Sequence, residues 1–268
     1  MAADAPIPPD VTTAILRLCD ETFLATVDWF AEIDSTNSQA LALLREQPET
    51  VNHAVWAAQQ MAGRGRGQNR WWSEAGALTV SLIVDPRQFG LTRAQWPQLS
   101  LTTGLAVCRA MGEFAADGVT SLKWPNDVYF NGRKLGGILI ESPGGPLDRL
   151  VIGIGLNVQN SLKQAPAEIR SQAASLCDDT ASPAQPVDVL IAVLDAWKEA
   201  ARQLAETPER VHQAWNDFSL LNDRMVAITT THADVMGRCV GIDANGALRV
   251  QLPTGPQTFT VGRVRLCE

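Results

Sequence analysis

Short apolar runs separated by turn residues predict several strands in the first half of the chain. Residues 53–58 form a short apolar run that is typical of a buried strand. Residues 78–84 (LTVSLIV) place Leu or Val at every second position, and this period of two predicts a strand that ends at Asp85 and Pro86. We expect further strands at residues 122–124, 128–130, 135–140 and 151–158.

Apolar residues at helical spacing predict four helices. Ser35 and Thr36 are good N-cap residues for a helix that ends before Pro48. Residues 97–114 repeat apolar residues at helical spacing, with Pro in the expected first turn, and predict a core-facing helix. The other two helical patterns cover residues 187–205 and 208–218.

The pattern changes near Arg224 to short strands, with the sequences MVAI, GRCVGID, ALRVQL and FTVGRVRL. These strands predict a small β-barrel of SH3-like size, and we place the two domains at residues 1–222 and 223–268.

Upstream, the turn at Asn131-Gly132 is the strongest hairpin signal in the chain. Residues 161–185 are rich in Ser, Ala, Pro and Asp, and we expect a loop-like connection there.

Composition predicts a cytoplasmic globular protein. The 268 residues suit one large domain and one small one, and no stretch approaches the roughly 18 to 20 apolar residues of a membrane span. The first ten residues resemble neither a secretory signal nor a lipidation site. The net charge of −7 disfavours unspecific nucleic-acid binding. The five cysteines and three histidines show no metal-ligand spacing, so we expect no protein-bound metal site.

A glycine- and arginine-rich segment, GRGRGQNRWW at residues 63–72, stands out against this acidic background. Glycines let the backbone approach a ligand closely, and arginines offer a fixed fork of donors to carboxylate or phosphate oxygens. Such a loop suits a reaction that brings two anions together. It has neither the Walker A spacing nor the GxGxxG spacing of a dinucleotide fold. The alternative is an ordinary surface loop or an RNA contact.

A second segment, SLKWPNDVYFNGRKLGGILIES at residues 121–142, places Lys123 at the end of a predicted strand. A buried ammonium needs a partner charge or a ligand, and an anionic ligand is the natural candidate. In the alternative interpretation, Lys123 pairs with Asp127 or Glu141, and Trp124 fills the core.

Together with EIDSTN at residues 32–37, Gln60 and GIGLN at residues 153–157, these segments give the chain a pattern that resembles the biotin protein ligase family over about residues 30–265. The resemblance implies an α/β (α+β) catalytic domain with a central mixed sheet, followed by a small SH3-like β-barrel. Too little sequence precedes the first motif for the winged helix-turn-helix of bifunctional members. We therefore expect a monofunctional form that binds no DNA.

The resemblance also implies a two-step reaction with ATP and biotin as substrates and Mg²⁺ as the accompanying ion. Biotin's carboxylate attacks the α-phosphate of ATP and gives biotinyl-AMP and pyrophosphate. A lysine of a biotin carboxyl carrier protein then attacks the activated carbonyl and releases AMP.

The resemblance assigns residues to this reaction position by position. Lys123 and Arg66 are the expected catalytic residues: Arg66 is expected to contact the carboxylate or acyl phosphate, and Lys123 to stabilise the charge that develops between biotin and phosphate. Trp71 is expected near the adenylate, although Trp72 fits the sequence equally well, and Asn157 is expected near the nucleotide or its metal. The remaining residues expected to bind biotin or the adenylate are Ser35, Thr36, Asn37, Gln60, Gly63, Arg64, Gly65 and Gly137.

Two other functions compete with this one. A lipoate or octanoate ligase or transferase shares the general fold and also modifies a carrier lysine, but the arginine-rich loop argues against it. A nucleic-acid-binding protein would use the Arg-Gly loop and the C-terminal barrel as an RNA surface, and the acidic charge argues against that. A homodimer through an exposed edge of the central sheet is left open by the sequence.

Overall fold

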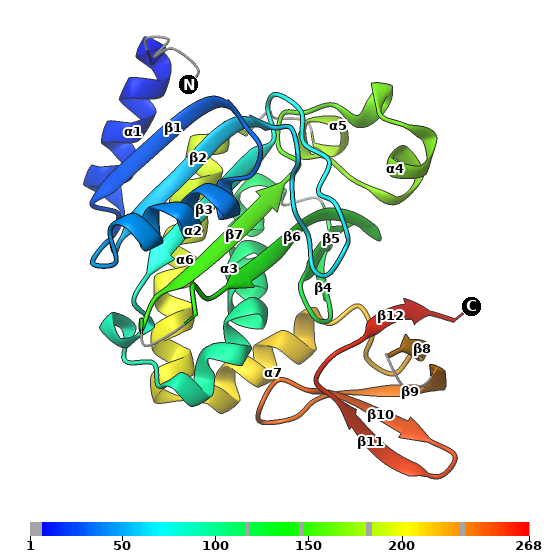
Figure 1. Cartoon of the computed structure of the whole chain (residues 1–268). Helices are drawn as coiled ribbons and strands as arrows, with labels where there is room; N and C mark the ends of the chain where they lie inside the picture. The colour runs from blue at the N-terminus through cyan, green and yellow to red at the C-terminus, as the bar shows by residue number, and fades with distance from the viewer. Residues whose placement is uncertain (1–6, 116–117, 145–146, 181–183, 231–233, 268) are drawn as a thin grey trace.

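The computed structural model of the chain describes residues 7–115, 118–144, 147–180, 184–230 and 234–267. A seven-stranded sheet of strand order β1-β2-β3-β7-β6-β5-β4 forms its centre (Figure 1). Strands β1 and β2 run parallel, and the other neighbours run antiparallel, which confirms the predicted mixed sheet. The strands are β1 (Thr26–Ile33), β2 (His53–Gln60), β3 (Leu78–Val84), β4 (Thr120–Lys123), β5 (Asp127–Phe130), β6 (Arg133–Glu141) and β7 (Leu150–Leu156).

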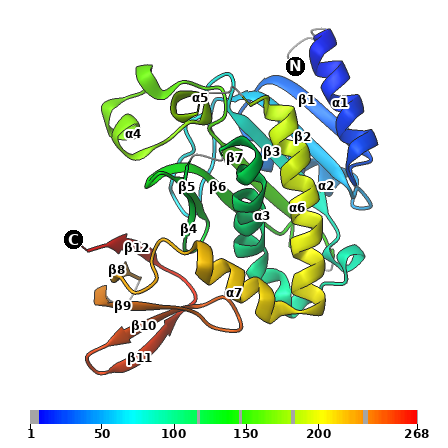
Figure 2. The same ribbon diagram turned by 180° about the vertical axis from the view of Figure 1, so that it is seen from behind.

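Helices cover both faces of this sheet. Figure 2 shows α3 (Leu99–Phe114) and α6 (Pro186–Glu206) on one face, beside α1 (Pro9–Glu21). Helix α2 (Thr36–Glu46) lies on the opposite face (Figure 1), where Ala40 and Leu44 form a small core of their own. The helices α2, α6 and α7 (Pro208–Phe218) confirm three predicted helices. Because the central strands are covered twice, β3 is buried at all seven positions despite its period-two pattern.

Three parts of the central domain differ from the prediction. Pro97 lies in a 3₁₀ turn, η2 (Arg93–Gln98), and α3 begins only at Leu99. Residues 161–185 are more than a loop: they contain η3 (Leu162–Gln164), α4 (Ala167–Gln172) and α5 (Leu176–Asp179). These helices are too short for a helical period, and tertiary burial of Leu162 and Leu176 stabilises η3 and α5. The helix α1 and the strand β1 were not predicted.

The hairpin between β5 and β6 confirms the Asn131-Gly132 prediction. Asn131 has φ 48° and Gly132 has φ 76°, so both occupy the left-handed region that a tight two-residue turn requires. The turn allows Asp127 of β5 to pair with Gly137 of β6, which brings Lys134 beside the Asp127 carboxylate.

The C-terminal residues form a separate five-stranded antiparallel sheet of order β11-β10-β9-β8-β12, which confirms the predicted SH3-like domain. The segment FTVGRVRL is not one strand, because the chain turns at Gly262 with φ 153° between two strands. We call this unit the C-terminal sheet. Its strands are β8 (Met225–Thr229), β9 (Asp234–Ile242), β10 (Leu248–Leu252), β11 (Gly255–Phe259) and β12 (Arg263–Leu266). None of the helices that the structure describes is long and apolar enough to cross a membrane.

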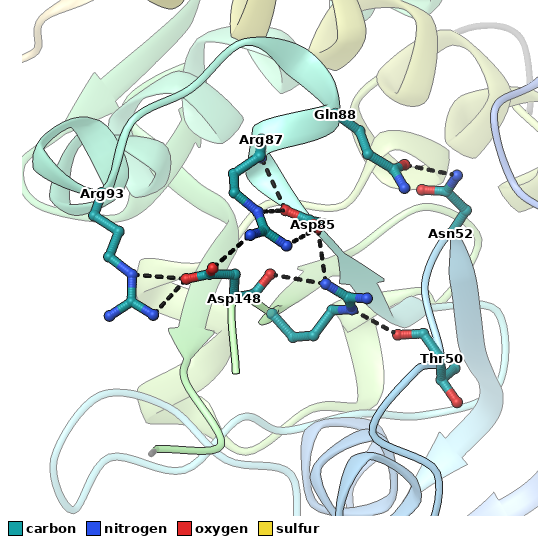
Figure 3. A network of polar contacts seen from close by, with 8 residues as sticks. Thr50, Asn52, Asp85, Arg87, Gln88, Arg93 and Asp148 are labelled. Carbon is teal, nitrogen blue, oxygen red and sulfur yellow. Dashed lines mark hydrogen bonds and ion pairs between the residues drawn. The ribbon is translucent and has the colours of Figure 1, made fainter. Parts of the chain in front are cut away.

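An ion-pair network fastens the sheet at the end of β3 (Figure 3). The buried Asp85 carboxylate accepts hydrogen bonds from Arg87 Nη2 at 2.7 Å and from Arg149 Nη1 at 2.8 Å. Asp148 in turn accepts from Arg93 Nε at 2.7 Å, and Arg149 Nε donates to the Thr50 carbonyl at 3.2 Å. The network therefore joins the segments that precede β2 and β7 to the end of β3.

Replacing Asp85 with Asn is expected to lower the free energy of unfolding by about 2–3 kcal/mol at pH 7, because it leaves Arg149 without its carboxylate. Urea unfolding measures this, with Asp195→Asn on the exposed side of α6 as the control. The hydrogen bond from Arg87 lowers the pKa of Asp85, so its stabilisation is present above the ordinary carboxyl pKa and is lost as the pH falls. Equal unfolding midpoints for the two variants would contradict the prediction.

Candidate functional site

A cavity of about 780 Å³ lies between the loop at residues 63–72, the strands β4 to β7 and the strand β12. We call it the larger cavity. Ten of the twelve predicted site residues line it, and they come from segments far apart in the sequence. They are Ser35, Thr36, Asn37, Gln60, Arg64, Gly65, Arg66, Trp71, Lys123 and Gly137.

The other two predicted residues, Gly63 and Asn157, lie outside the lining of this cavity. The Gly63 carbonyl accepts a hydrogen bond from Trp71 N at 2.9 Å, so Gly63 closes the base of the loop. Asn157 is buried, donates from Nδ2 to the Ala174 carbonyl at 2.9 Å and accepts at Oδ1 from Asn160 Nδ2 at 2.9 Å. Both ends of its amide therefore have protein partners, and its role toward a nucleotide stays a prediction.

The start of α2 forms the polar end of the larger cavity. Thr36 donates from its backbone N and its Oγ1 to Gln60 Oε1, at 2.8 and 3.1 Å. Ser81 of β3 donates from Oγ to Asn37 Oδ1 at 2.6 Å. A Cβ at Gly153 of β7 would overlap the Asn37 amide, so only glycine leaves room for this side chain. The buried amide and hydroxyl groups are thus held in place before any ligand binds.

Glu141 at the end of β6 fixes the loop to this polar end. Its carboxylate accepts two hydrogen bonds from Arg64, at 2.9 and 2.7 Å, and a third from Asn37 Nδ2 at 2.9 Å. Glu141 and Ser81 were not predicted as parts of the site. No local signal identifies them, because their partners lie between 44 and 104 residues away along the chain.

Lys123 at the end of β4 has no carboxylate partner among the residues that the structure describes. Asp127 instead pairs with Lys134 at 2.6 Å, and Glu141 pairs with Arg64, so the alternative ion pairs of Lys123 are wrong. Lys123 Nζ donates to the Tyr129 hydroxyl at 3.3 Å. Burial lowers the pKa of Lys123, and the Asp127 charge partly opposes that effect.

Trp124, which follows Lys123, is buried in the core, as the alternative interpretation expected. Its indole Nε1 donates to the Gly246 carbonyl of the C-terminal sheet at 3.1 Å. It therefore fills core space and fixes the C-terminal sheet to the central domain.

Arg66 supplies a second cation to the larger cavity. Burial lowers the pKa of its guanidinium, and the Asp127 charge partly offsets that shift. Within the described ranges its guanidinium has neither a hydrogen bond nor an ion pair. Arg263 of β12 also lines the cavity and donates to Asn69 Oδ1 of the loop at 3.3 Å. The C-terminal sheet therefore forms part of the wall of the larger cavity.

Trp71, and not Trp72, lines the cavity, which favours Trp71 where the sequence left both open. Its ring packs on Gly155 of β7, where a Cβ would lie 2.7 Å from Trp71 Cε2. The Trp71 Nε1–H is buried and has no acceptor among the described residues. The cavity therefore combines a flat aromatic wall with Lys123 and Arg66, which lack carboxylate partners in the described structure, an arrangement suited to a reaction between two anions.

Two family models match the chain. The Biotin/lipoate A/B protein ligase family matches residues 29–157, and the Biotin protein ligase C terminal domain matches residues 223–266. The first match contains the loop at residues 63–72 and Lys123, and the second contains the C-terminal sheet.

Named relatives are similar in sequence to this chain along most of its length. It is 32% identical over 248 residues to a biotin–[acetyl-CoA-carboxylase] ligase of Paracoccus denitrificans, covering 87% of this chain and 98% of the relative. It is 33% identical to one of Mycobacterium tuberculosis, covering 88% and 79%. The structure of an Aquifex aeolicus biotin protein ligase in complex with biotin and ATP superposes with a TM-score of 0.78 at 28% identity, covering 90% of this chain and 99% of that one.

Proposed function

Because the chain belongs to the biotin protein ligase family, we propose that it activates biotin with ATP and attaches it to a lysine of a biotin carboxyl carrier protein. The enzyme is then a biotin–[biotin carboxyl carrier protein] ligase that forms AMP. In the first step, a carboxylate oxygen of biotin attacks the α-phosphorus of ATP, and the bond to the β-phosphate oxygen breaks. Pyrophosphate leaves, and biotinyl-AMP stays in the larger cavity.

The observation that carries this proposal is the pairing of charges around the cavity. Asp127 and Glu141 are held by Lys134 and Arg64, while Lys123 and the Arg66 guanidinium are left for a ligand. Two anions repel each other as they approach. Fixed cations in a site that excludes water lower this repulsion in the transition state. We propose that Lys123 and Arg66 act electrostatically on the reacting carboxylate and phosphate.

Different groups of the cavity wall are proposed to hold the two substrates. The polar end around Thr36, Asn37 and Gln60 offers fixed donors and acceptors for the ring system of biotin. Trp71, with its unpaired Nε1–H, is the proposed wall for the adenylate. The Leishmania major biotin protein ligase in complex with biotinyl-5-AMP, with a TM-score of 0.61 and 28% identity, supports an adenylate in this fold.

Mg²⁺ is proposed to enter with ATP, held mainly by phosphate oxygens and water. The residue types of the cavity agree with this, because its nearby carboxylates are engaged by Lys134 and Arg64, and the described residues contain no group of three that could hold a metal ion. Mg²⁺ would supply charge neutralisation to the leaving pyrophosphate.

The remaining proposals concern organisation and partners. We place the domain boundary after residue 222, because β8 to β12 pair only with one another in the described part of the chain. A homodimer through the central sheet would use β1, since the outer side of β4 is bonded to residues 219–220. The cytoplasmic location and the lack of DNA binding stay predictions.

Pyrophosphate release with ATP and Mg²⁺ tests this function without any carrier protein. Biotin is expected to support release at least about 100-fold better than lipoate or octanoate, because a site built around fixed polar groups rejects acids that leave them unpaired. Faster release with lipoate would move the chain to a lipoate ligase function. No release with any of the three acids would contradict an acyl-adenylate reaction.

A further inference from the structure

Tyr129 of β5, the single tyrosine of the chain, contacts the lysine that is proposed to be catalytic. Its hydroxyl accepts the hydrogen bond from Lys123 Nζ at 3.3 Å, and both residues line the larger cavity. Among the residues that the structure describes, this hydroxyl is the one hydrogen-bond partner of the Lys123 ammonium. The position of the ammonium therefore depends on Tyr129.

The register of the sheet explains why Lys123 meets a hydroxyl and not a carboxylate. In the pair of β4 and β5, Lys123 lies opposite Asp127, and Ser121 lies opposite Tyr129. Side chains two residues apart share one face of a strand, so Tyr129 is the diagonal neighbour of Lys123 and within reach of its long side chain. The directly opposite carboxylate, Asp127, is engaged by Lys134 of β6 at 2.6 Å.

A neutral partner suits a lysine whose charge has to act on a substrate. A carboxylate at this distance would cancel much of the Lys123 charge before any anion arrived, whereas a hydroxyl accepts a hydrogen bond and leaves the net charge in place. Burial raises the pKa of Tyr129 to about 12, and the Asp127 charge raises it further. The hydroxyl therefore stays neutral at pH values where an ordinary lysine is charged.

We propose that Tyr129 is a positioning residue, which holds the Lys123 ammonium toward the reacting carboxylate and phosphate without neutralising it. The inference rests on the proposed function, in which Lys123 stabilises the charge that develops between these groups. A cation that is already held in place needs no reorganisation when that charge develops. Tyr129 acts on the reaction only through Lys123.

The hydrogen bond also helps to keep Lys123 charged. Burial lowers the pKa of Lys123, Asp127 of β5 raises it, and Lys134 of β6 and Arg263 of β12 lower it. A hydrogen bond that the charged form donates favours that form, so the Tyr129 hydroxyl opposes the effect of burial. Removing the hydroxyl should therefore make Lys123 lose its proton at a lower pH.

Tyr129→Phe tests the proposal, because it keeps the aromatic ring and removes only the hydroxyl. Ser121→Ala is the matched control: it removes a hydroxyl from the position directly opposite Tyr129, and Ser121 does not line the larger cavity. The values of kcat and KM for biotin-dependent pyrophosphate release are measured over a range of pH for wild type and both variants. Urea unfolding checks that each variant is folded.

Tyr129→Phe is expected to lower kcat about 10-fold and to leave the KM for biotin within about 2-fold, because a misplaced cation affects the transition state more than binding. The alkaline fall of kcat/KM should also move to lower pH than in the wild type, and Ser121→Ala should change neither value. A lower kcat with the alkaline fall in its wild-type position would reduce Tyr129 to a structural role and overturn the proposal. So would an unchanged kcat, or loss of the alkaline fall, which would assign the titration to Tyr129 itself.

The single tyrosine also permits a direct spectroscopic test on the unmodified chain. Protein made with tyrosine that carries ¹³C at Cζ gives one signal, from Tyr129. This signal is expected to shift at the pH of the alkaline fall, below the pKa of about 12 of the hydroxyl itself. The shift should be absent in Lys123→Ala and present in Lys198→Ala.

A wild-type signal without this shift, or a shift that persists in Lys123→Ala, would overturn the contact and with it the proposal. Wild-type protein that shows the shift but releases no pyrophosphate would instead refute the proposed function.

Discussion

Replacing Lys123 with alanine is expected to slow biotin-dependent pyrophosphate release about 10²–10³-fold, the range found when one preorganised donor to a developing charge is removed. The reason is that Lys123 has no carboxylate partner in the described structure, so its charge is available to the substrates. Stopped-flow or continuous pyrophosphate assays measure the effect. Lys198→Ala on the exposed side of α6 is the control and should leave the rate unchanged.

The pH dependence adds a second readout for the same residue. Burial lowers the pKa of Lys123, so the unliganded enzyme is expected to lose this charge at a lower pH than an ordinary lysine would. The value of kcat/KM for pyrophosphate release should therefore fall on the alkaline side. Lys123→Arg keeps its charge over this range, so its remaining activity should lack that alkaline limb. An unchanged limb in Lys123→Arg would assign the titration to another group.

Replacing Gly153 with alanine is expected to weaken biotin binding about 30–1000-fold. A Cβ at Gly153 would overlap the amide oxygen of Asn37, and the displaced amide would lose its bonds to Ser81 and Glu141. Biotin would have to return the displaced Asn37 amide to its position, at a cost of about 2–4 kcal/mol, which corresponds to this range of affinity. Calorimetric titration of biotin measures it.

Gly112→Ala is the matched control for this substitution. Gly112 is exposed in α3, and a Cβ there would meet nothing within 4 Å. The control should bind biotin like the wild type and unfold at an equal or slightly higher denaturant concentration, since alanine favours a helix over glycine. Equal biotin affinity for the two variants would mean that Asn37 does not hold the ligand.

Local patterns were sufficient for several elements, although α1 and β1 were missed. The N-cap at Ser35, the turn at Asn131-Gly132 and the long apolar period of α6 each depend on neighbours within a few residues. The short helices between β7 and α6 could not be predicted in this way, because their stability comes from burial of single residues such as Leu176. The break in the last predicted strand follows from a turn at Gly262 that the apolar period hides.

The residues of the candidate site also differ in whether a local sequence signal identifies them. The cations of the site lie in short segments whose residue types already indicate an anionic ligand, and the resemblance to the biotin protein ligase family singled out Arg66 and Lys123 among them. The residues that hold the loop in place could not be identified in this way, because Glu141 and Arg263 reach their partners Arg64 and Asn69 only after the sheet and the two domains assemble. Asn157 illustrates the opposite case, since its motif predicts a ligand contact while the fold gives its amide two protein partners.

The most direct test of the central claim is to mix the enzyme with biotin, ATP and Mg²⁺ in a single turnover without carrier, and to analyse the enzyme-bound material by mass spectrometry. Biotinyl-AMP is expected in an amount close to that of the enzyme. This biotinyl-AMP should disappear when the carrier is added, while biotin appears on one carrier lysine and AMP is released. Transfer of biotin without ATP, or with no adenylate formed before the carrier is added, would contradict the central claim.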